Sequence, residues 1–205
     1  MTVELDTLLA GLEDRTSEKF QKKPEVVAKN ESFDVSKLPI EKPEWHAIDD
    51  LVCVYFDLKA STELAMGRTP ASTASIYDAG VGGVTKILRE FDSDFVDVQG
   101  DGGFGLFWGE LRFERAITAA ITIRTFSMKF TEQLEKKWKD APTTGFKVGV
   151  SSGPIMAKRV GLPRQLEFQE PVWAGNPVNY AAKAAQQASP ETMFVTGSVF
   201  DKLFQ

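Results

Sequence analysis

The chain has 205 residues and a formal net charge of −5, with 42% apolar and 26% charged residues. These values are typical of one globular domain with a sizeable core and a short appendage. The acidic balance argues against the basic surface that nucleic-acid binding needs, so we expect no nucleic-acid partner. The one cysteine, Cys53, cannot form an intrachain disulfide, and no apolar run reaches the ~18 residues of a membrane span. We therefore expect no membrane segment and a cytoplasmic location.

The beginning of the chain has the pattern of a helical arm. Apolar residues recur at helical spacing within residues 1–28, and they are Leu5, Leu8, Leu9 and Leu12. Residues 22–44 are charged and contain three prolines, which favours a linker. Two interpretations remain open for this region, a solvated tether and a segment that packs on a partner subunit. We place the boundary between the arm, residues 1–47, and the main domain, residues 48–205, at residue 47.

Strands and helices alternate after Asp50. The apolar run 51–56 predicts a central strand that is buried on both faces. Thr69 followed by Pro70 is a helix N-cap signal, and the helix that it opens is expected to end near Phe91. Three glycines weaken this helix and are expected to let it lie close against another backbone; they are Gly80, Gly82 and Gly83.

The remaining elements follow from the same signals. Strands are expected at residues 95–98, 104–108, 146–150 and 193–196, and helices at 113–134 and 176–188 and after the cap residue Ser198. Residues 100–103 form the turn of a hairpin, and Asn176 before Pro177 repeats the cap-and-proline signal. This order predicts an α+β fold with a ferredoxin-like βαββαβ core, helices on one face of an antiparallel sheet and an N-terminal helical arm.

Two aspartates are the candidates for chemistry. Asp57 and Asp101 each end an apolar β-type run and are followed by small residues. Such a run puts its last carboxylate at a sheet edge, and small residues leave backbone N–H groups accessible to phosphate. Two facing carboxylates would hold divalent cations against a triphosphate. The alternative is that both aspartates are ordinary turn residues at strand ends.

Four segments in order resemble the class III nucleotidyl cyclases over about residues 51–203. They are 56–62, similar to D-I-x-G-[FS]-T, then 100–102, then 148–154, similar to G-x-x-x-G, and 175–183, similar to G-[DN]-x-V-N-x-A-[AS]-R. The resemblance implies a ferredoxin-like cyclase core in which the ribose 3′-hydroxyl attacks the α-phosphorus and pyrophosphate leaves. It also implies two divalent ions, Mn²⁺ or Mg²⁺, held by Asp57, Asp101 and the carbonyl of Leu58.

The resemblance assigns further site residues. Asn179 would orient the ribose, and Lys183, in place of the family's arginine, would stabilise charge on the α-phosphate without a bidentate fork. The expected substrate-binding residues are Tyr55, Phe56, Ser61, Thr62 and Asp97. Family members build each site from two chains, which implies a homodimer with composite active sites. The family's usual final hairpin does not follow residues 193–196, so either this subfamily lacks it or the chain is abbreviated.

The positions that read the base depart from the family pattern. Adenylate-making members carry a lysine where this chain has Asp97, and their second base-reading residue would align near Val172. The nearby aromatic residues Tyr55, Phe104 and Trp173 are either core or the walls of a pocket that fits one ring. In this respect the chain is similar to the pyrimidine cyclases of the bacterial Pycsar anti-phage system. That similarity implies UTP, or else CTP, as substrate and a separate cyclic-nucleotide-binding effector.

Three alternatives remain. The first is an adenylate or guanylate cyclase with an unusual pocket. The second is a catalytically silent homologue that binds nucleotide and regulates a partner, although both metal aspartates and Asn179 are in place. The third is a ferredoxin-like RNA-binding module, which would need exposed aromatic residues in a basic strand; residues 104–107 lie in an acidic domain instead.

Overall fold

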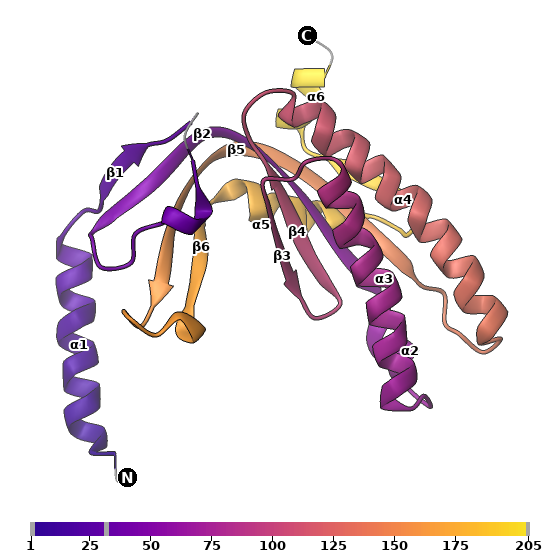
Figure 1. Cartoon of the computed structure of the whole chain (residues 1–205), viewed down its shortest axis with the longest axis horizontal. Coiled ribbons are helices and arrows are strands. Elements are labelled where there is room, and N and C mark those ends of the chain that lie inside the picture. The colour runs from indigo at the N-terminus through magenta and orange to yellow at the C-terminus, as the bar shows by residue number, and fades with distance from the viewer. Residues whose placement is uncertain (1–2, 31–32, 204–205) are drawn as a thin grey trace.

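The computed structural model describes residues 3–30 and 33–203. These residues form a curled seven-stranded sheet in the order β3-β4-β2-β5-β6, with β1 added beside β2 and β7 beside β5 (Figure 1). The strands are β1 Glu25–Ala28, β2 Glu44–Lys59, β3 Phe95–Gln99, β4 Gly102–Phe107, β5 Gly145–Gly161, β6 Gln169–Gly175 and β7 Met193–Val195. The α-helices are α1 Leu5–Gln21, α2 Ser61–Ala65, α3 Pro70–Glu90, α4 Arg112–Lys137, α5 Asn176–Gln187 and α6 Gly197–Leu203.

The two long strands β2 and β5 are the centre of the sheet and pair antiparallel. The predicted strand 51–56 is the buried middle of β2, where β-branched and apolar residues suit a strand covered on both faces. The predicted hairpin is confirmed as β3 and β4, and the predicted long helix is confirmed as α4. The sequence pattern therefore located the core strands and most of the helices.

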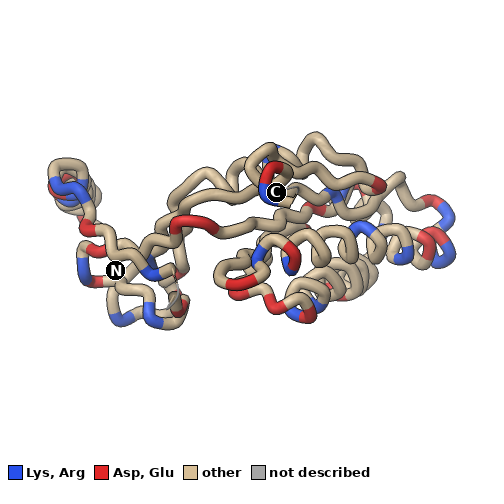
Figure 2. The backbone as a smooth tube through the Cα atoms, turned by 90° about the horizontal axis from the view of Figure 1, so that it is seen from above, with Lys and Arg blue, Asp and Glu red and all other residues tan. Residues whose placement is uncertain are grey.

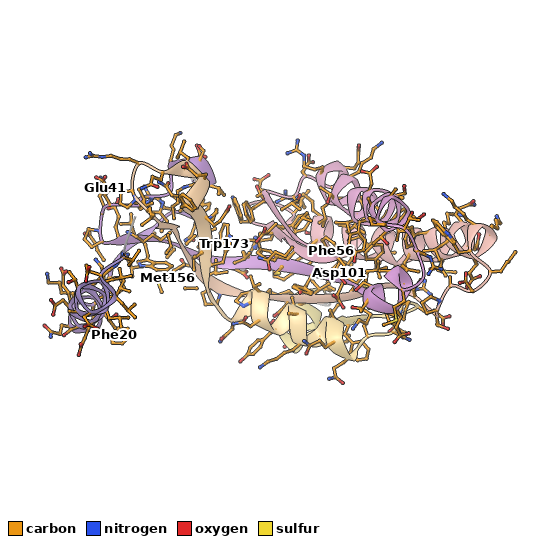
Figure 3. The ribbon with its side chains drawn as sticks, turned by 90° about the horizontal axis from the view of Figure 1, so that it is seen from below. Phe20, Glu41, Phe56, Asp101, Met156 and Trp173 are labelled. Atoms are coloured by element: carbon orange, nitrogen blue, oxygen red, sulfur yellow. The ribbon has the colours of Figure 1, made fainter. Side chains whose placement is uncertain are left out.

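Helices cover both faces of the sheet, which corrects the expectation of helices on one face. α3 and α4 pack over one face, where Val52 and Val54 belong to their core, and α5 packs over the other (Figures 1 and 3). The physical reason lies at Gly149 of β5. A Cβ atom there would overlap the carbonyl of Ala181, so the main chain of α5 rests directly on the strand.

Only one of the three predicted helix caps forms as expected. The Thr69 hydroxyl accepts a hydrogen bond from the Ser72 N–H at 3.2 Å, with Pro70 in the first turn of α3. Asn176 instead lies inside α5, because β6 continues to Gly175 and the helix begins at once. At α6 the Ser198 hydroxyl donates to the Ser152 carbonyl at 3.1 Å and does not cap the helix.

The arm is more structured than the expected linker. No residue of α1 is buried, and the helix extends from one end of the sheet (Figure 1). β1 lies within the segment expected to be a linker and pairs in parallel with the start of β2. Since β2 begins at Glu44, residues 44–59 run without interruption through the position expected for the domain boundary.

Candidate functional site

The two aspartates come together where β2 ends beside the β3–β4 turn. Asp57 is the register partner of Gly102, and the Leu58 N–H donates to the Asp101 carbonyl at 3.2 Å. A Cβ atom at Gly102 would lie 2.8 Å from the Phe56 carbonyl oxygen and 3.4 Å from Asp57 Oδ1. Glycine therefore lets the turn that carries Asp101 lie directly against the strand that carries Asp57 (Figure 3).

Two neighbouring side chains, Tyr55 and Lys147, describe the electrostatic environment of these aspartates. Burial raises the pKa of Tyr55, and the negative charges of Asp57 and Asp101 raise it further. Both carboxylates thus act on the same phenol. Lys147, the register partner of Asp57 on β5, places its Nζ atom 3.3 Å from Asp57 Oδ2.

Lys147 is a site residue that the sequence interpretation missed. It directly precedes the segment 148–154 of the cyclase resemblance, and it is the one cation in the otherwise apolar run 146–150. That position was visible in the sequence, but its partner was not. Only the register between β2 and β5 shows that Lys147 faces Asp57.

The donor set suits a metal that is shared with a substrate. Among residues 3–30 and 33–203, no group of three or more His, Cys, Asp or Glu side chains gathers closely enough to hold a metal ion. Mg²⁺ is commonly bound by one or two carboxylates together with water and substrate phosphates. The pair Asp57 and Asp101, held together by the Leu58–Asp101 hydrogen bond, fits that requirement.

Three of the predicted base-pocket residues lie in one row across the sheet. Tyr55 is the register partner of Phe104, and Phe104 is the register partner of Asp97. The opposite neighbour of Tyr55 is Gly149, which has no side chain. The Asp97 carboxylate accepts a hydrogen bond from Gln99 Nε2 at 3.0 Å and is half-buried. We refer to Tyr55, Phe104 and Asp97 as the base row.

Phe56 lies on the other face of the sheet. Its side chain is fully buried in the core beneath α3 and α4, edge-on to Phe146 with ring centroids 6.1 Å apart. Phe56 can therefore meet a substrate only through its main chain. Ser61 and Thr62 lie at the start of α2, directly after the Asp57 segment; Ser61 is half-buried and Thr62 is exposed.

Asn179 and Lys183 lie on the outer side of α5. Both are exposed on α5, on the side of the helix opposite the buried Ala181 and Ala185 that rest on the sheet. The Lys183 Nζ atom is 5.7 Å from the centroid of the Tyr180 ring. Within one copy of the chain, the two α5 residues therefore point away from the sheet that carries the two aspartates.

The surface of the described chain carries mixed charge. Lysine and arginine positions are scattered among aspartate and glutamate positions along the backbone (Figure 2). No helix within the described residues is both long enough and apolar enough to span a membrane.

Solved structures of cyclase domains share the fold of this chain, with its curled and mainly antiparallel sheet. The structure of the adenylyl cyclase CyaB from P. aeruginosa superposes with a TM-score of 0.69 at 14% identity, covering 78% of this chain and 83% of that one. The guanylate cyclase domain of RhGC from Catenaria anguillulae gives 0.62 at 13% identity, covering 77% and 83%.

The sequence comparison identifies the family. Residues 45–205 match the adenylate and guanylate cyclase catalytic domain, and the chain belongs to this family. A uridylate cyclase of Micromonospora echinofusca is 53% identical over 200 residues, which are 97% of this chain and 65% of that protein. A uridylate cyclase of Propioniciclava tarda is 47% identical over 180 residues, 87% of this chain and 58% of that protein. The chain thus spans less than two thirds of the length of these relatives.

Proposed function

We propose that the chain is a nucleotidyl cyclase that converts UTP into 3′,5′-cyclic UMP and pyrophosphate. The observation that carries this proposal is the pair Asp57 and Asp101, which the Leu58–Asp101 main-chain hydrogen bond holds close together at a strand end beside the base row. Two relatives named as uridylate cyclases, 53% and 47% identical, support the choice of uracil over other bases. CTP is the second candidate substrate, because the choice of uracil rests on the names of these relatives and not on a residue of the base row.

The proposed cofactors are two divalent ions, Mn²⁺ or Mg²⁺, held by the carboxylates of Asp57 and Asp101 and the carbonyl of Leu58. When bound, such ions lower the pKa of the attacking 3′-hydroxyl and neutralise the triphosphate oxygens. The protein contributes the geometry, since the Leu58–Asp101 hydrogen bond fixes the turn against the strand before any substrate binds.

Lys147 is the proposed phosphate-binding cation from the sheet. Its Nζ atom lies 3.3 Å from Asp57 Oδ2 and its side chain is only 19% exposed, so the cation is already beside Asp57. In the free protein it partly neutralises the Asp57 carboxylate. With substrate bound, the triphosphate oxygens offer a second negative partner within reach of the same flexible side chain.

Asn179 and Lys183 are proposed to act on a substrate held by a second copy of the chain. They are exposed on the side of α5 that points away from the sheet, which favours a site in which they meet the aspartates of another copy. In this homodimer Asn179 would orient the ribose and Lys183 would stabilise charge on the α-phosphate. Lysine supplies this charge as a point and not as the planar fork of an arginine.

The base row is proposed to exclude purines by size. Tyr55 and Phe104 are adjacent aromatic residues on the site face, and Asp97 cannot act as the cationic donor that adenine-selective relatives present. Steric overlap rejects a larger base more strongly than a missing hydrogen bond does. We further propose that the cyclic product is a messenger in anti-phage defence that is detected by a separate effector, in keeping with the similarity to pyrimidine cyclases.

The direct test is to incubate the protein with each of the four nucleoside triphosphates and Mn²⁺ and to identify the products by mass. We expect cyclic UMP as the main product. Comparable cyclisation of ATP and UTP at equal concentration would contradict the small pocket and favour the adenylate or guanylate alternative. No product from any triphosphate, with nucleotide binding retained, would favour a silent regulatory homologue.

The metal pair is tested by Asp57→Ala and Asp101→Ala, with Asp78→Ala as the control. Asp78 is exposed on α3, which packs on the opposite face of the sheet. Loss of a metal ligand removes several kcal/mol of transition-state stabilisation, so we expect each site variant to lose at least about a hundredfold in kcat. Near-normal turnover in either variant, measured as pyrophosphate release, would end the cyclase proposal.

A further inference from the structure

A cluster of aromatic rings joins the arm to the site face of the sheet. We call Phe33, Phe95, Phe104, Trp108 and Trp173 the aromatic cluster. The Phe33 ring centroid is 5.0 Å from that of Trp108 and 5.9 Å from that of Trp173. Trp173 is 5.0 Å from Phe95, and Phe95 is 6.2 Å from Phe104. Phe33 thus enters the cluster from a segment that precedes the matched family domain.

Main-chain hydrogen bonds hold the segment around Phe33 in place. The Lys29 N–H donates to the Ala47 carbonyl of β2 at 2.9 Å, and the Arg159 N–H of β5 donates to the Pro39 carbonyl at 3.2 Å. These bonds attach residue 29 to β2 and residue 39 to β5, so the chain is anchored before and after Phe33.

Trp173 depends on its neighbours for its position. The indole Nε1 atom is buried and has no hydrogen-bond partner among the described residues. A buried N–H group without an acceptor costs free energy. A movement that brings the indole N–H to an acceptor or to water would therefore be favourable. The rings of Phe33, Phe95 and Trp108 pack against the indole in this position.

The aromatic cluster borders the base row. Phe104 belongs to both, since it is the register partner of Tyr55 and of Asp97 and also lies beside Phe95. Tyr55 and Trp173 pack against the same buried core on this face of the sheet. In Figure 3 Trp173 lies between the arm end of the molecule and Asp101. A base seated on the row would have Trp173 on its arm side.

We propose that Phe33 is a positioning residue that holds Trp173 as the outer wall of the base pocket, so that the arm sets base selectivity. This inference rests on the proposed function and deepens it. Removing the phenyl ring leaves a void beside Trp173, and the indole, with its unpaired N–H, moves into it. The indole of Trp173 then lies farther from the bound base, so a pyrimidine loses contacts with it and a purine has more room.

The test compares Phe33→Ala and Phe33→Leu with Phe20→Ala. Phe20 is an aromatic residue of the same arm whose exposure is 86%, so its loss should change nothing. We expect Phe33→Ala to raise the KM for UTP about tenfold with kcat nearly unchanged, and to raise the ratio of kcat/KM for ATP to that for UTP by a similar factor. Phe33→Leu keeps part of the packing, so its KM for UTP and its ATP-to-UTP ratio should lie between those of Phe33→Ala and Phe20→Ala.

A second readout follows Trp173 itself. Its release should shift the tryptophan emission of Phe33→Ala to the red, and the shift should be absent when Trp173→Phe is added. The shift tests the packing role even if the wild-type protein cyclises no triphosphate, an outcome that defeats the proposed function alone. Unchanged KM and unchanged ATP-to-UTP ratio in a folded Phe33→Ala protein would overturn the inference. If that variant does not fold, unchanged values in Phe33→Leu would overturn it in the same way.

Discussion

At the scale of single residues, glycines lie where the protein brings main chain or rings into direct contact. Gly102 allows the Asp101 turn to lie on β2, and Gly149 allows α5 to lie on β5. On α3, the sequence alone suggested that three glycines serve one purpose. The structure separates them, because Gly82 is exposed while Gly83 lies under the ring of Phe126.

This difference predicts opposite effects at two adjacent positions. For Gly82→Ala the new methyl group has only Asp78 Oδ1 nearby, at 3.9 Å. We expect this substitution to raise the free energy of unfolding by about 0.5–1 kcal/mol, because it lowers the entropy of the unfolded chain. For Gly83→Ala the methyl group overlaps the Phe126 ring, and we expect the free energy of unfolding to fall by about 1–3 kcal/mol. Urea unfolding of both variants measures the difference, and equal effects would mean that α3 and α4 pack differently in solution.

Sequence reasoning reached the site residues that carry their own local signal. Asp57 and Asp101 stand at the ends of apolar runs before small residues, and the structure places them together. Lys147 and Phe33 were not found because their roles arise from partners far away in the chain. Lys147 becomes a site residue only through the register of β5 on β2, and Phe33 only through the fold of the arm.

At the scale of elements, the strands that were missed are those with weak patterns. β1 has four residues within a charged stretch, and it forms because β2 offers it an edge. β6 contains Pro171, which usually argues against a strand. It is tolerated here because β6 is the last strand of the sheet path, where one side of the strand needs no ladder partner. The strands with long apolar runs were all recognised.

α1 should contribute nothing to the stability of the isolated fold. None of its residues is buried, and its leucines are 47–60% exposed. We expect deletion of residues 1–21 to leave the Tm within about 2 °C of that of the full chain, since almost no apolar area returns to water. Deletion of residues 1–38, which also removes Phe33 and the buried Leu38, should lower it clearly. A large drop for the shorter deletion, measured by circular dichroism, would mean that α1 is covered in an assembly.

At the scale of the whole molecule, the separation of the two halves of the site predicts complementation. Asp57→Ala and Lys183→Ala proteins should each be nearly inactive. Mixed one to one with free exchange, half of the dimers contain one variant of each kind, and one of their two sites is intact. We expect about a quarter of the wild-type cyclic nucleotide yield per chain.

The control for this experiment is a mixture of Asp57→Ala with Asp101→Ala. Both substitutions affect the same half of the site, so every composite site in that mixture stays defective. Activity in this control would mean that Asp57 and Asp101 do not belong to the same half of a site. No activity in the first mixture, although native mass spectrometry shows mixed dimers, would argue for a site within one chain.

The pairing of β2 with β5 sets the order in which the protein can be completed as it is synthesised. Residues 60–144 separate these two strands, so β2 leaves the ribosome long before its main partner exists. At about 5–20 residues per second, the edge of β2 that pairs with β5 stays without a partner for on the order of ten seconds, while β4 can pair only with the opposite edge. The core therefore forms late in translation, and we expect chaperones to bind the nascent chain mainly in that interval.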